Sequence, residues 1–377
     1  MTEPASGGSV TTIDEKNELR STARKFFEKH SGEAAVRIAM ETADGFDRAL
    51  WLAMANELGL QGLAIPEEFG GAGFSFSDLQ IVLEEMGRAL VCAPFLASAV
   101  LAAHALIASG DTGACRDYLP GIADGTVIAT LAFTDRRGRW SADSSEVTAE
   151  LGDDGYTITG TRHFVLDGST ADVIFVSVHT GTGVSLFAVT PGAGVDITSL
   201  TTLDMTRRQA NLEFDHAPAQ LIGAAGESKG AIDAALSAGL AALAAEQVGG
   251  ARCAMEMSVE YAKIREQFGR PIGSFQAIKH KCADMLLEVE TSTSAAYAAG
   301  AAIDENSSET ALLASLAKSY CSEAFFHVAA ETIQVHGGIG FTWEHPAHLY
   351  FRRAKASELL FGNPVHHRER ILRELGL

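Results

Sequence analysis

The spacing of apolar residues changes twice along this chain, and that change constrains the fold more than any other feature. In the first third they recur at intervals of three and four, as at Leu79, Val82 and Met86, which is typical of amphipathic helices. Between residues 127 and 222 they form short runs separated by turn residues, which predicts β-strands. From about Glu227 onwards the helical spacing returns. The chain is therefore expected to combine helical and β regions in a fixed order.

This order predicts an α+β fold with three domains. They are an N-terminal helical domain (1–125), a sandwich- or barrel-like central β domain (126–223) and a C-terminal four-helix bundle (224–377). The expected strands are 127–133, 147–149, 156–161, 173–178, 184–189 and 210–214. Asp153-Asp154-Gly155 is typical of a hairpin turn. Glycines at 269–273 and 337–340 separate the last helices.

Composition limits the classes of partner. With 47% apolar and 20% charged residues, the 377-residue chain is expected to be globular and not disordered. Its formal charge of −19 argues against binding to nucleic acid or to an anionic membrane surface. The five cysteines are scattered without a CxxC pair, which favours buried thiols in a reducing compartment.

Two segments bear on the location of the protein. Met1 to Asp14 is a polar stretch without the basic and apolar parts of a signal peptide, and we expect it to be a frayed tail. Ala93 to Ala108 is apolar, but it contains Pro94 and His104 and is shorter than a membrane span, so a buried helix is expected. Cytoplasm is the expected location.

Two glycine-bearing segments of the last third could bind an anion. In Gln334-Val335-His336-Gly337-Gly338-Ile339-Gly340-Phe341-Thr342 the glycines would let backbone N–H groups approach a ligand, although a corner between helices also needs glycine. In the segment 265–276, Arg265 could grip a phosphate and Phe268 could offer its ring to a planar group. The alternative is that Arg265 satisfies helix carbonyls while Phe268 lies in the core.

Among the titratable side chains there are few candidates for a metal ligand or a catalytic base. The C-terminal histidines at 327, 336, 345, 348, 366 and 367 lack metal-ligand spacing, so no metal site is predicted. Glu246 stands inside an alanine-rich helical segment, where burial would suit a general base. The alternatives are a surface position on the helix or a buried ion pair with an arginine such as Arg252.

The assembled motifs resemble the acyl-CoA dehydrogenase family of flavoproteins over essentially the whole chain. The resemblance rests on the strings at 59–73 (GLQGLAIPEEFGGAG), 83–88 (LEEMGR) and 154–160 (DGYTITG). It is completed by Arg265-x-x-Phe268-Gly269 with Gln276, and by Gln334-Val335-His336-Gly337-Gly338.

The resemblance implies FAD bound at a subunit interface. Residues matching Arg265, Phe268, Gln276, Gln334, Val335, His336, Gly337 and Gly338 hold the pyrophosphate and adenosine of an FAD whose flavin ring lies in the neighbouring subunit. The residues expected around the flavin ring match the family poorly. Thr134 matches the family, but Trp140 replaces a serine, Leu166 replaces a hydroxyl beside the ring, and Leu240 replaces an arginine of the pocket.

The catalytic base of the resembled family is also missing from its usual places. Removal of the α-proton of an acyl thioester needs a carboxylate, and the two positions that carry it in the family hold Phe361 and Gly239 here. Glu246 lies two helical turns beyond Gly239 on the same face.

Three hypotheses follow from the resemblance. The chain is one subunit of a heteromeric acyl-CoA dehydrogenase, as in bacterial members acting on bulky steroid-type acyl-CoA side chains. Alternatively it is a self-sufficient dehydrogenase that uses Glu246, or a structural paralogue or other flavoenzyme of the same fold. The implied partners are an acyl-CoA substrate, an electron-transferring flavoprotein as acceptor, and a homo- or heterotetramer with another acyl-CoA dehydrogenase subunit.

Overall fold

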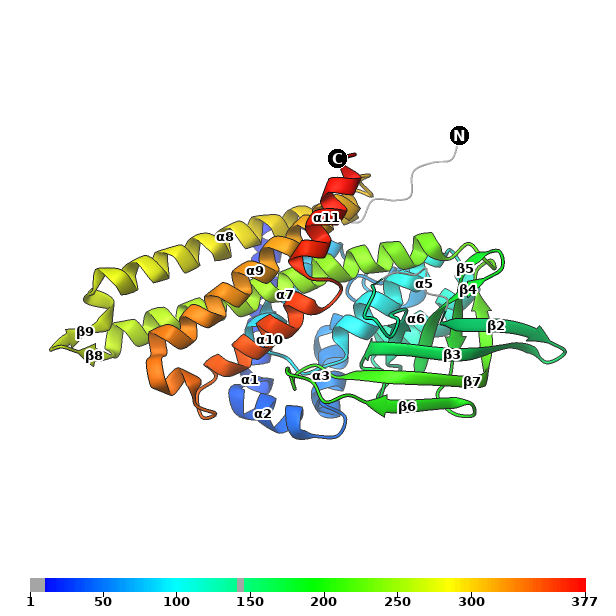
Figure 1. Ribbon diagram of the computed structural model, residues 1–377, viewed down its shortest axis with the longest axis horizontal. Helices are drawn as coiled ribbons and strands as arrows, with labels where there is room; N and C mark the ends of the chain where they lie inside the picture. Colours follow the sequence, from blue (N-terminus) through cyan, green and yellow to red (C-terminus); the bar gives the residue numbers. More distant parts are fainter. Residues whose placement is uncertain (1–10, 141–145) are drawn as a thin grey trace. The chain divides into compact units, whose positions relative to one another are not determined.

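Figure 1 shows the computed structural model, which describes residues 11–140 and 146–377. The N-terminal helical elements are α1 (Ile13–His30), α2 (Glu33–Glu41), α3 (Arg48–Leu58), η1 (Leu60–Gly62), η2 (Glu67–Phe69), α4 (Phe76–Arg88), η3 (Leu96–Ala102), α5 (Ala103–Ser109) and α6 (Thr112–Ala123). The strands are β1 (Ala129–Ala132), β2 (Val147–Gly152), β3 (Gly155–Leu166), β4 (Val173–Thr180), β5 (Gly183–Val189), β6 (Val195–Ser199) and β7 (Gln209–Ile222). The last region contains α7 (Lys229–Ile264), β8 (Glu266–Gln267), β9 (Arg270–Pro271), η4 (Ile272–Ser274), α8 (Gln276–Asp304), α9 (Thr310–His336), η5 (Gly337–Phe341), α10 (Ala347–Leu359) and α11 (Pro364–Glu374). This order confirms the predicted fold class.

The predicted tail, Met1 to Asp14, overlaps the first helix. Its first ten residues lie outside the described part of the chain, but α1 already begins at Ile13. Thr12 caps this helix by accepting a hydrogen bond from the backbone N–H of Glu15, whose side chain bonds back to Thr12. The reciprocal capping box satisfies two N–H groups and so starts the helix before Asp14.

The described residues form two compact units. Unit 1 contains Ile38–Ser75 and Cys92–Gly239, and unit 2 contains Thr12–Arg37, Phe76–Val91 and Leu240–Leu377. Helices α1 and α4 therefore belong with the C-terminal helices, although they precede the strands in sequence. The boundaries proposed at residues 125 and 223 follow the change of secondary structure, whereas the units follow packing.

The strands of unit 1 form one bent sheet. The strand order is β1-β4-β5-β7-β3-β2, and β6 pairs with β7. Because β1 also contacts β3 and β2 contacts β4, the two ends of the sheet face each other across an apolar core in the manner of a sandwich. Gly152 pairs with Gly155, which confirms the predicted hairpin turn. Strand β6 was not predicted.

The segment expected as a buried helix is helical and buried, but its first part is wound as a π-helix. Helix η3 adopts this winding, and its seven residues are all buried. The hydroxyl of Ser98 accepts a hydrogen bond from the backbone N–H of Ala129 at 3.0 Å. Helix η3 is thereby fixed against strand β1 inside unit 1.

The helices of unit 2 pack around α9. Helices α8, α10 and α11 contact α9 (Figure 1). Helix α1 contacts α4, and α4 contacts α8. Two glycines bring α4 and α7 together, since a Cβ on Gly249 would lie 1.7 Å from the carbonyl oxygen of Glu84, and one on Gly87 would lie 2.0 Å from that of Glu246. Among the described helices, α7 alone is long and apolar enough to cross a membrane, and 89% of its apolar window is buried inside the fold.

Candidate functional site

The segment 265–276 forms an exposed hairpin after α7. Strands β8 and β9 are joined by Phe268 and Gly269, both with positive φ (53° and 75°), as a tight hairpin turn requires. The ring of Phe268 is 91% exposed. The guanidinium of Arg270 lies 4.1 Å from the ring centre of Phe275, whereas Arg265 is exposed. A large ring held in an unfavourable backbone conformation and left in solvent indicates a surface for a ligand or a second chain.

The second glycine segment begins in the last turn of α9, and its glycines follow the end of that helix. Gly337 has a φ of 63°, and a Cβ on Gly340 would lie 2.9 Å from Cβ of His336, so conformation and packing account for these two glycines. Neither reason applies to Gly338. A Cβ atom added at Gly337 or Gly338 would meet no atom of the described residues within 4 Å. The backbone here is accessible to a group from outside the chain.

An aromatic stack brings the two segments together. The ring of Tyr261, one turn before Arg265, lies 4.4 Å from the ring of His336. His336 is 4% exposed, and its Nδ1 is 2.7 Å from the carbonyl oxygen of Thr332. Burial lowers the pKa of His336, so the imidazole is neutral at pH 7. Val335 is also buried, whereas Gln276 and Gln334 are exposed near the ends of their helices.

Glu246 is buried and faces an arginine. Its side chain, on α7, lies 3.6 Å from Nη1 of Arg353 on α10, and the two residues are 7% and 4% exposed. The partner is not Arg252, which pairs instead with Glu290 at 2.8 Å and with Glu84. The ion-pair interpretation is therefore supported, with a different arginine from the one expected. The catalytic role of Glu246 stays a prediction.

The residues expected beside a flavin ring lie in unit 1. Thr134 follows β1, is buried, and accepts a hydrogen bond at its carbonyl oxygen from the N–H of His163 at 3.1 Å. The next residue, Asp135, is buried and accepts hydrogen bonds from the N–H groups of Arg137 and Arg139. Ser141, the residue after Trp140, lies outside the described residues. Leu166 is buried too, so its apolar side chain belongs to the fold.

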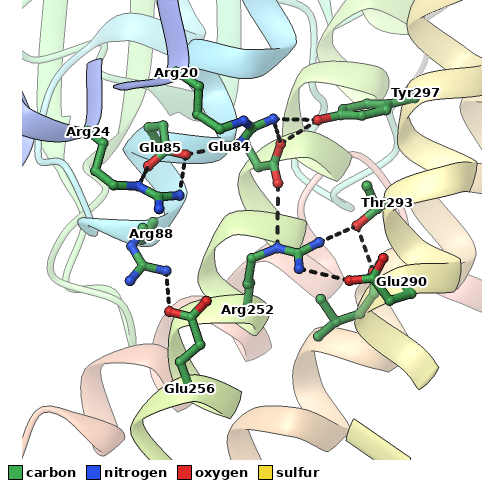
Figure 2. Close-up of polar contacts among 11 residues, drawn as sticks. Arg20, Arg24, Glu84, Glu85, Arg88, Arg252, Glu256, Glu290, Thr293 and Tyr297 are labelled. Atoms are coloured by element: carbon green, nitrogen blue, oxygen red, sulfur yellow. Dashed lines mark hydrogen bonds and ion pairs between the residues drawn. The ribbon is translucent and has the colours of Figure 1, made fainter. Parts of the chain in front are cut away.

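The structure also contains a charge network that the sequence analysis did not anticipate (Figure 2). Two carboxylates of α4, Glu84 and Glu85, are only 3% and 2% exposed. Arg24 binds Glu85 through two hydrogen bonds of 2.8 Å, and Arg20 bridges Glu85 and Glu84 at 3.0 and 2.7 Å. Tyr297 donates to Glu84 at 2.8 Å.

This network ties α1, α4, α7 and α8 together within unit 2. Burial, reinforced by the neighbouring Glu84, raises the pKa of Tyr297 to about 12, so its hydroxyl stays a donor. Arg88 forms a separate ion pair with Glu256 at 2.6 Å beside the network (Figure 2). The signal was present in the string at 83–88, where two adjacent carboxylates stand between apolar residues of a helix.

Comparison with known proteins gives matches along most of the chain. The acyl-CoA dehydrogenase N-terminal domain matches residues 13–126 and the C-terminal domain matches residues 230–376. The chain is 36% identical over 352 residues to acyl-CoA dehydrogenase IpdE2 of Mycolicibacterium smegmatis, which covers 93% of this chain and 96% of the relative.

Two solved structures with similar sequences give the same result. The Tcur3481–Tcur3483 steroid ACAD matches with a TM-score of 0.87 at 32% identity, covering 96% of this chain and 98% of that one. The ChsE4–ChsE5 complex from Mycobacterium tuberculosis matches with a TM-score of 0.88 at 30% identity, covering 98% and 99%.

Proposed function

The chain belongs to the acyl-CoA dehydrogenase family, and on that premise we propose that it works as one subunit of a heteromeric enzyme. In that assembly it holds the pyrophosphate and adenosine of an FAD whose flavin ring lies in the partner. FAD is the cofactor of the family, and its members are oxidoreductases acting on acyl-CoA.

The observation that carries this proposal is the contrast between two parts of the chain. The exposed guanidinium of Arg265, the exposed ring of Phe268 and the open backbone at Gly338 lie on segments joined by the Tyr261–His336 stack. This donor set fits a dinucleotide, because guanidinium and backbone N–H groups bind phosphate oxygens and an aromatic face accepts a planar base. The positions expected to hold the base carry Phe361 and Gly239 instead.

The reaction divides between the subunits accordingly. A carboxylate takes the α-proton of the thioester, and the electron pair left behind forms the α,β double bond as the β-hydride departs. FAD, when bound, accepts that hydride. In this proposal Arg265 neutralises phosphate charge while Gln276 and Gln334 orient the cofactor, and the partner supplies the carboxylate.

A self-sufficient enzyme using Glu246 is the second candidate. It is favoured by the burial of this carboxylate on α7, but the guanidinium of Arg353 at 3.6 Å already gives Glu246 a structural role. The third candidate is a structural paralogue or another flavoenzyme of the same fold. In that case the exposed hairpin would not serve an acyl-CoA dehydrogenase reaction.

The remaining partners are proposed from the family and its named relatives. The proposed electron acceptor is an electron-transferring flavoprotein. The proposed assembly is a tetramer, and the proposed location is the cytoplasm. The steroid enzyme and the two-subunit complex among the similar structures support a bulky acyl-CoA substrate and a heteromer.

Purification of the chain alone and with a second acyl-CoA dehydrogenase subunit tests the proposal. We expect the chain alone to be colourless and the complex to be yellow and active with acyl-CoA. Yellow protein with stoichiometric FAD that bleaches on addition of acyl-CoA, obtained without a partner, would contradict it.

Substitution of Arg265 tests the cofactor half-site in the complex. Loss of a charged hydrogen bond to phosphate should weaken FAD binding about tenfold to a hundredfold in Arg265→Gln. The matched control is Arg270→Gln in the same hairpin, because its guanidinium stacks on Phe275; its FAD affinity should stay within about threefold. Equal losses in both variants would refute the assignment of Arg265.

The Glu246→Gln variant separates the two catalytic hypotheses. If the partner supplies the base, turnover per FAD of the assembled enzyme should change less than about threefold, while thermal stability falls because Arg353 loses its counter-charge. A loss of turnover beyond about a hundredfold would identify Glu246 as the general base.

A further inference from the structure

A cavity of about 280 Å³ lies between the end of α7 and the start of α8, within unit 2. These two helices are joined by the β8–β9 hairpin and η4 (Figure 1). Gly273 of η4 lines the cavity and packs tightly on α7, since a Cβ there would lie 2.8 Å from the carbonyl oxygen of Ala262. The volume is near the lower end of the range for small-molecule sites, so the cavity suits one small ligand.

Apolar groups form most of the cavity wall. They belong to Val259 and Ala262 on α7, Pro271 on β9, and Ile278 and Cys282 on α8. Burial raises the pKa of the Cys282 thiol, so this group is neutral at pH 7 and is part of the apolar wall. A ligand with a hydrocarbon body is favoured, because its apolar surface leaves water on binding.

The charged groups that line the cavity are all cationic. Among the described residues they are the ammonium groups of Lys263 and Lys279, and no carboxylate lines the cavity with them. Lys279 is exposed, and Lys263 binds Glu260 at 2.6 Å on the same helix. The side chains of this pair are 61% and 70% exposed, so the pair is weak and Lys263 can turn towards a ligand. In a chain with a formal charge of −19, two ammonium groups beside an apolar cavity favour an anion.

This cavity is distinct from the half-site proposed for the cofactor. Ile278 and Cys282 are four residues apart and share one face of α8, whereas Gln276 is rotated by about 200° from Ile278 and lies on the opposite face. Neither Arg265 nor Phe268 lines the cavity. A ligand here would therefore use different side chains from those proposed to bind FAD.

We propose that the cavity binds a small amphiphilic anion. Its hydrocarbon body packs on Val259 and Ile278, and its carboxylate lies between Lys263 and Lys279. The inference does not depend on the proposed function, because it uses only the shape of the cavity and the charges around it. Octanoate is a suitable probe, since it carries one carboxylate on an unbranched hydrocarbon chain.

Calorimetric titration of the chain with octanoate tests the proposal. We expect saturable binding whose affinity rises about fourfold with each methylene added from hexanoate to octanoate and falls with salt. Octan-1-ol and octylammonium, which lack the negative charge, should bind at least tenfold more weakly. Absence of saturable binding, or equal affinity for octanoate and octan-1-ol, would overturn the inference.

Variants locate the bound anion. Lys279→Gln removes an exposed charge at the cavity and should weaken octanoate binding about threefold to tenfold. The matched control is Lys281→Gln on the same helix, because this ammonium binds Glu331 and does not line the cavity. Val259→Phe adds a ring to the apolar wall and should prevent binding. Equal effects of Lys279→Gln and Lys281→Gln would overturn the inference.

Alkylation by N-ethylmaleimide, resolved by peptide mass spectrometry, extends the test to the complex with the partner subunit. Octanoate should slow the labelling of Cys282 and leave that of Cys253 unchanged, because Cys253 is also half-buried but lines a different cavity. Binding to the chain alone that is lost in the complex would mean that the partner covers the cavity, and would overturn the proposal of a ligand site.

Discussion

The charge network of Figure 2 predicts a stability change that can be calculated and measured. The perturbation is Glu85→Gln, which keeps the shape of the side chain and removes its charge. Glu85 is 2% exposed and binds Arg20 at 3.0 Å and Arg24 at 2.8 Å. The substitution leaves two guanidinium groups facing a neutral amide.

The magnitude follows from the exposure of the partners. Breaking a buried ion pair costs about 3–5 kcal/mol. Because the side chains of Arg20 and Arg24 are 27% and 36% exposed, water compensates part of the loss, and about 3 kcal/mol is expected. With an unfolding entropy of about 2.1 cal/mol/K per residue, the 377 residues give about 0.8 kcal/mol/K, which predicts a decrease in Tm of about 4 °C.

The assay is thermal unfolding followed by circular dichroism at low and moderate salt. The control is Glu33→Gln, which removes a surface pair between Glu33 and Arg37 at 2.8 Å, four residues apart on one helix. That pair should contribute under 1 kcal/mol and should weaken with salt. If Glu85→Gln and Glu33→Gln lower Tm equally, the network does not stabilise unit 2 as reasoned.

Two further predictions concern close packing and pH. Gly249→Ala should destabilise the protein severely, because its Cβ would lie 1.7 Å from the carbonyl oxygen of Glu84. In Gly230→Ala the new Cβ meets no described atom within 4 Å, so this control should stabilise α7 by about 0.5–1 kcal/mol. Urea unfolding measures both changes. Burial lowers the pKa of His367 to about 3 from an ordinary value of 6.5. Between these two pH values the imidazole is protonated in the unfolded chain and neutral in the folded chain. Stability should therefore fall by about 1.4 kcal/mol per pH unit as the pH decreases from 6.5 towards 3, and His367→Gln should flatten this dependence; parallel pH profiles would contradict it.

Regular elements were predictable because their side chains follow one period. The hairpin at Asp153-Asp154-Gly155 and the breaks before α8 and after α9 appear where the sequence placed them, whereas the break between α8 and α9 was not predicted. Strand β6 was not predicted, since its five residues pair with β7 and gain their conformation from that neighbour. Strand β7 extends past the predicted end at Phe214 even though it contains Pro218, because β3 and β5 pair with its later residues.

The candidate site also has a part that the sequence predicts and a part that only tertiary packing creates. The segment 265–276 was recognisable because glycines stand beside Arg265 and Phe268, and the segment 334–338 because paired glycines follow His336. The stack of Tyr261 on His336 that joins them is tertiary and has no sequence signal. The cavity between α7 and α8 was missed for a related reason, since its walls come from α7, β9, η4 and α8 and form only when these elements pack together.

The distribution of arginines in unit 2 bears on how a polyanionic substrate is bound. Arg20, Arg24 and Arg252 are engaged with carboxylates of the network, and Arg353 faces Glu246. Binding CoA through these groups would break buried or half-buried ion pairs, at a cost comparable to the gain. Arg265 keeps its guanidinium exposed, so it is available to phosphate without such a loss. In a chain with a formal charge of −19, favourable phosphate binding is thus expected at the hairpin that we propose to hold the cofactor, and under the same proposal the acyl-CoA is bound by the partner subunit.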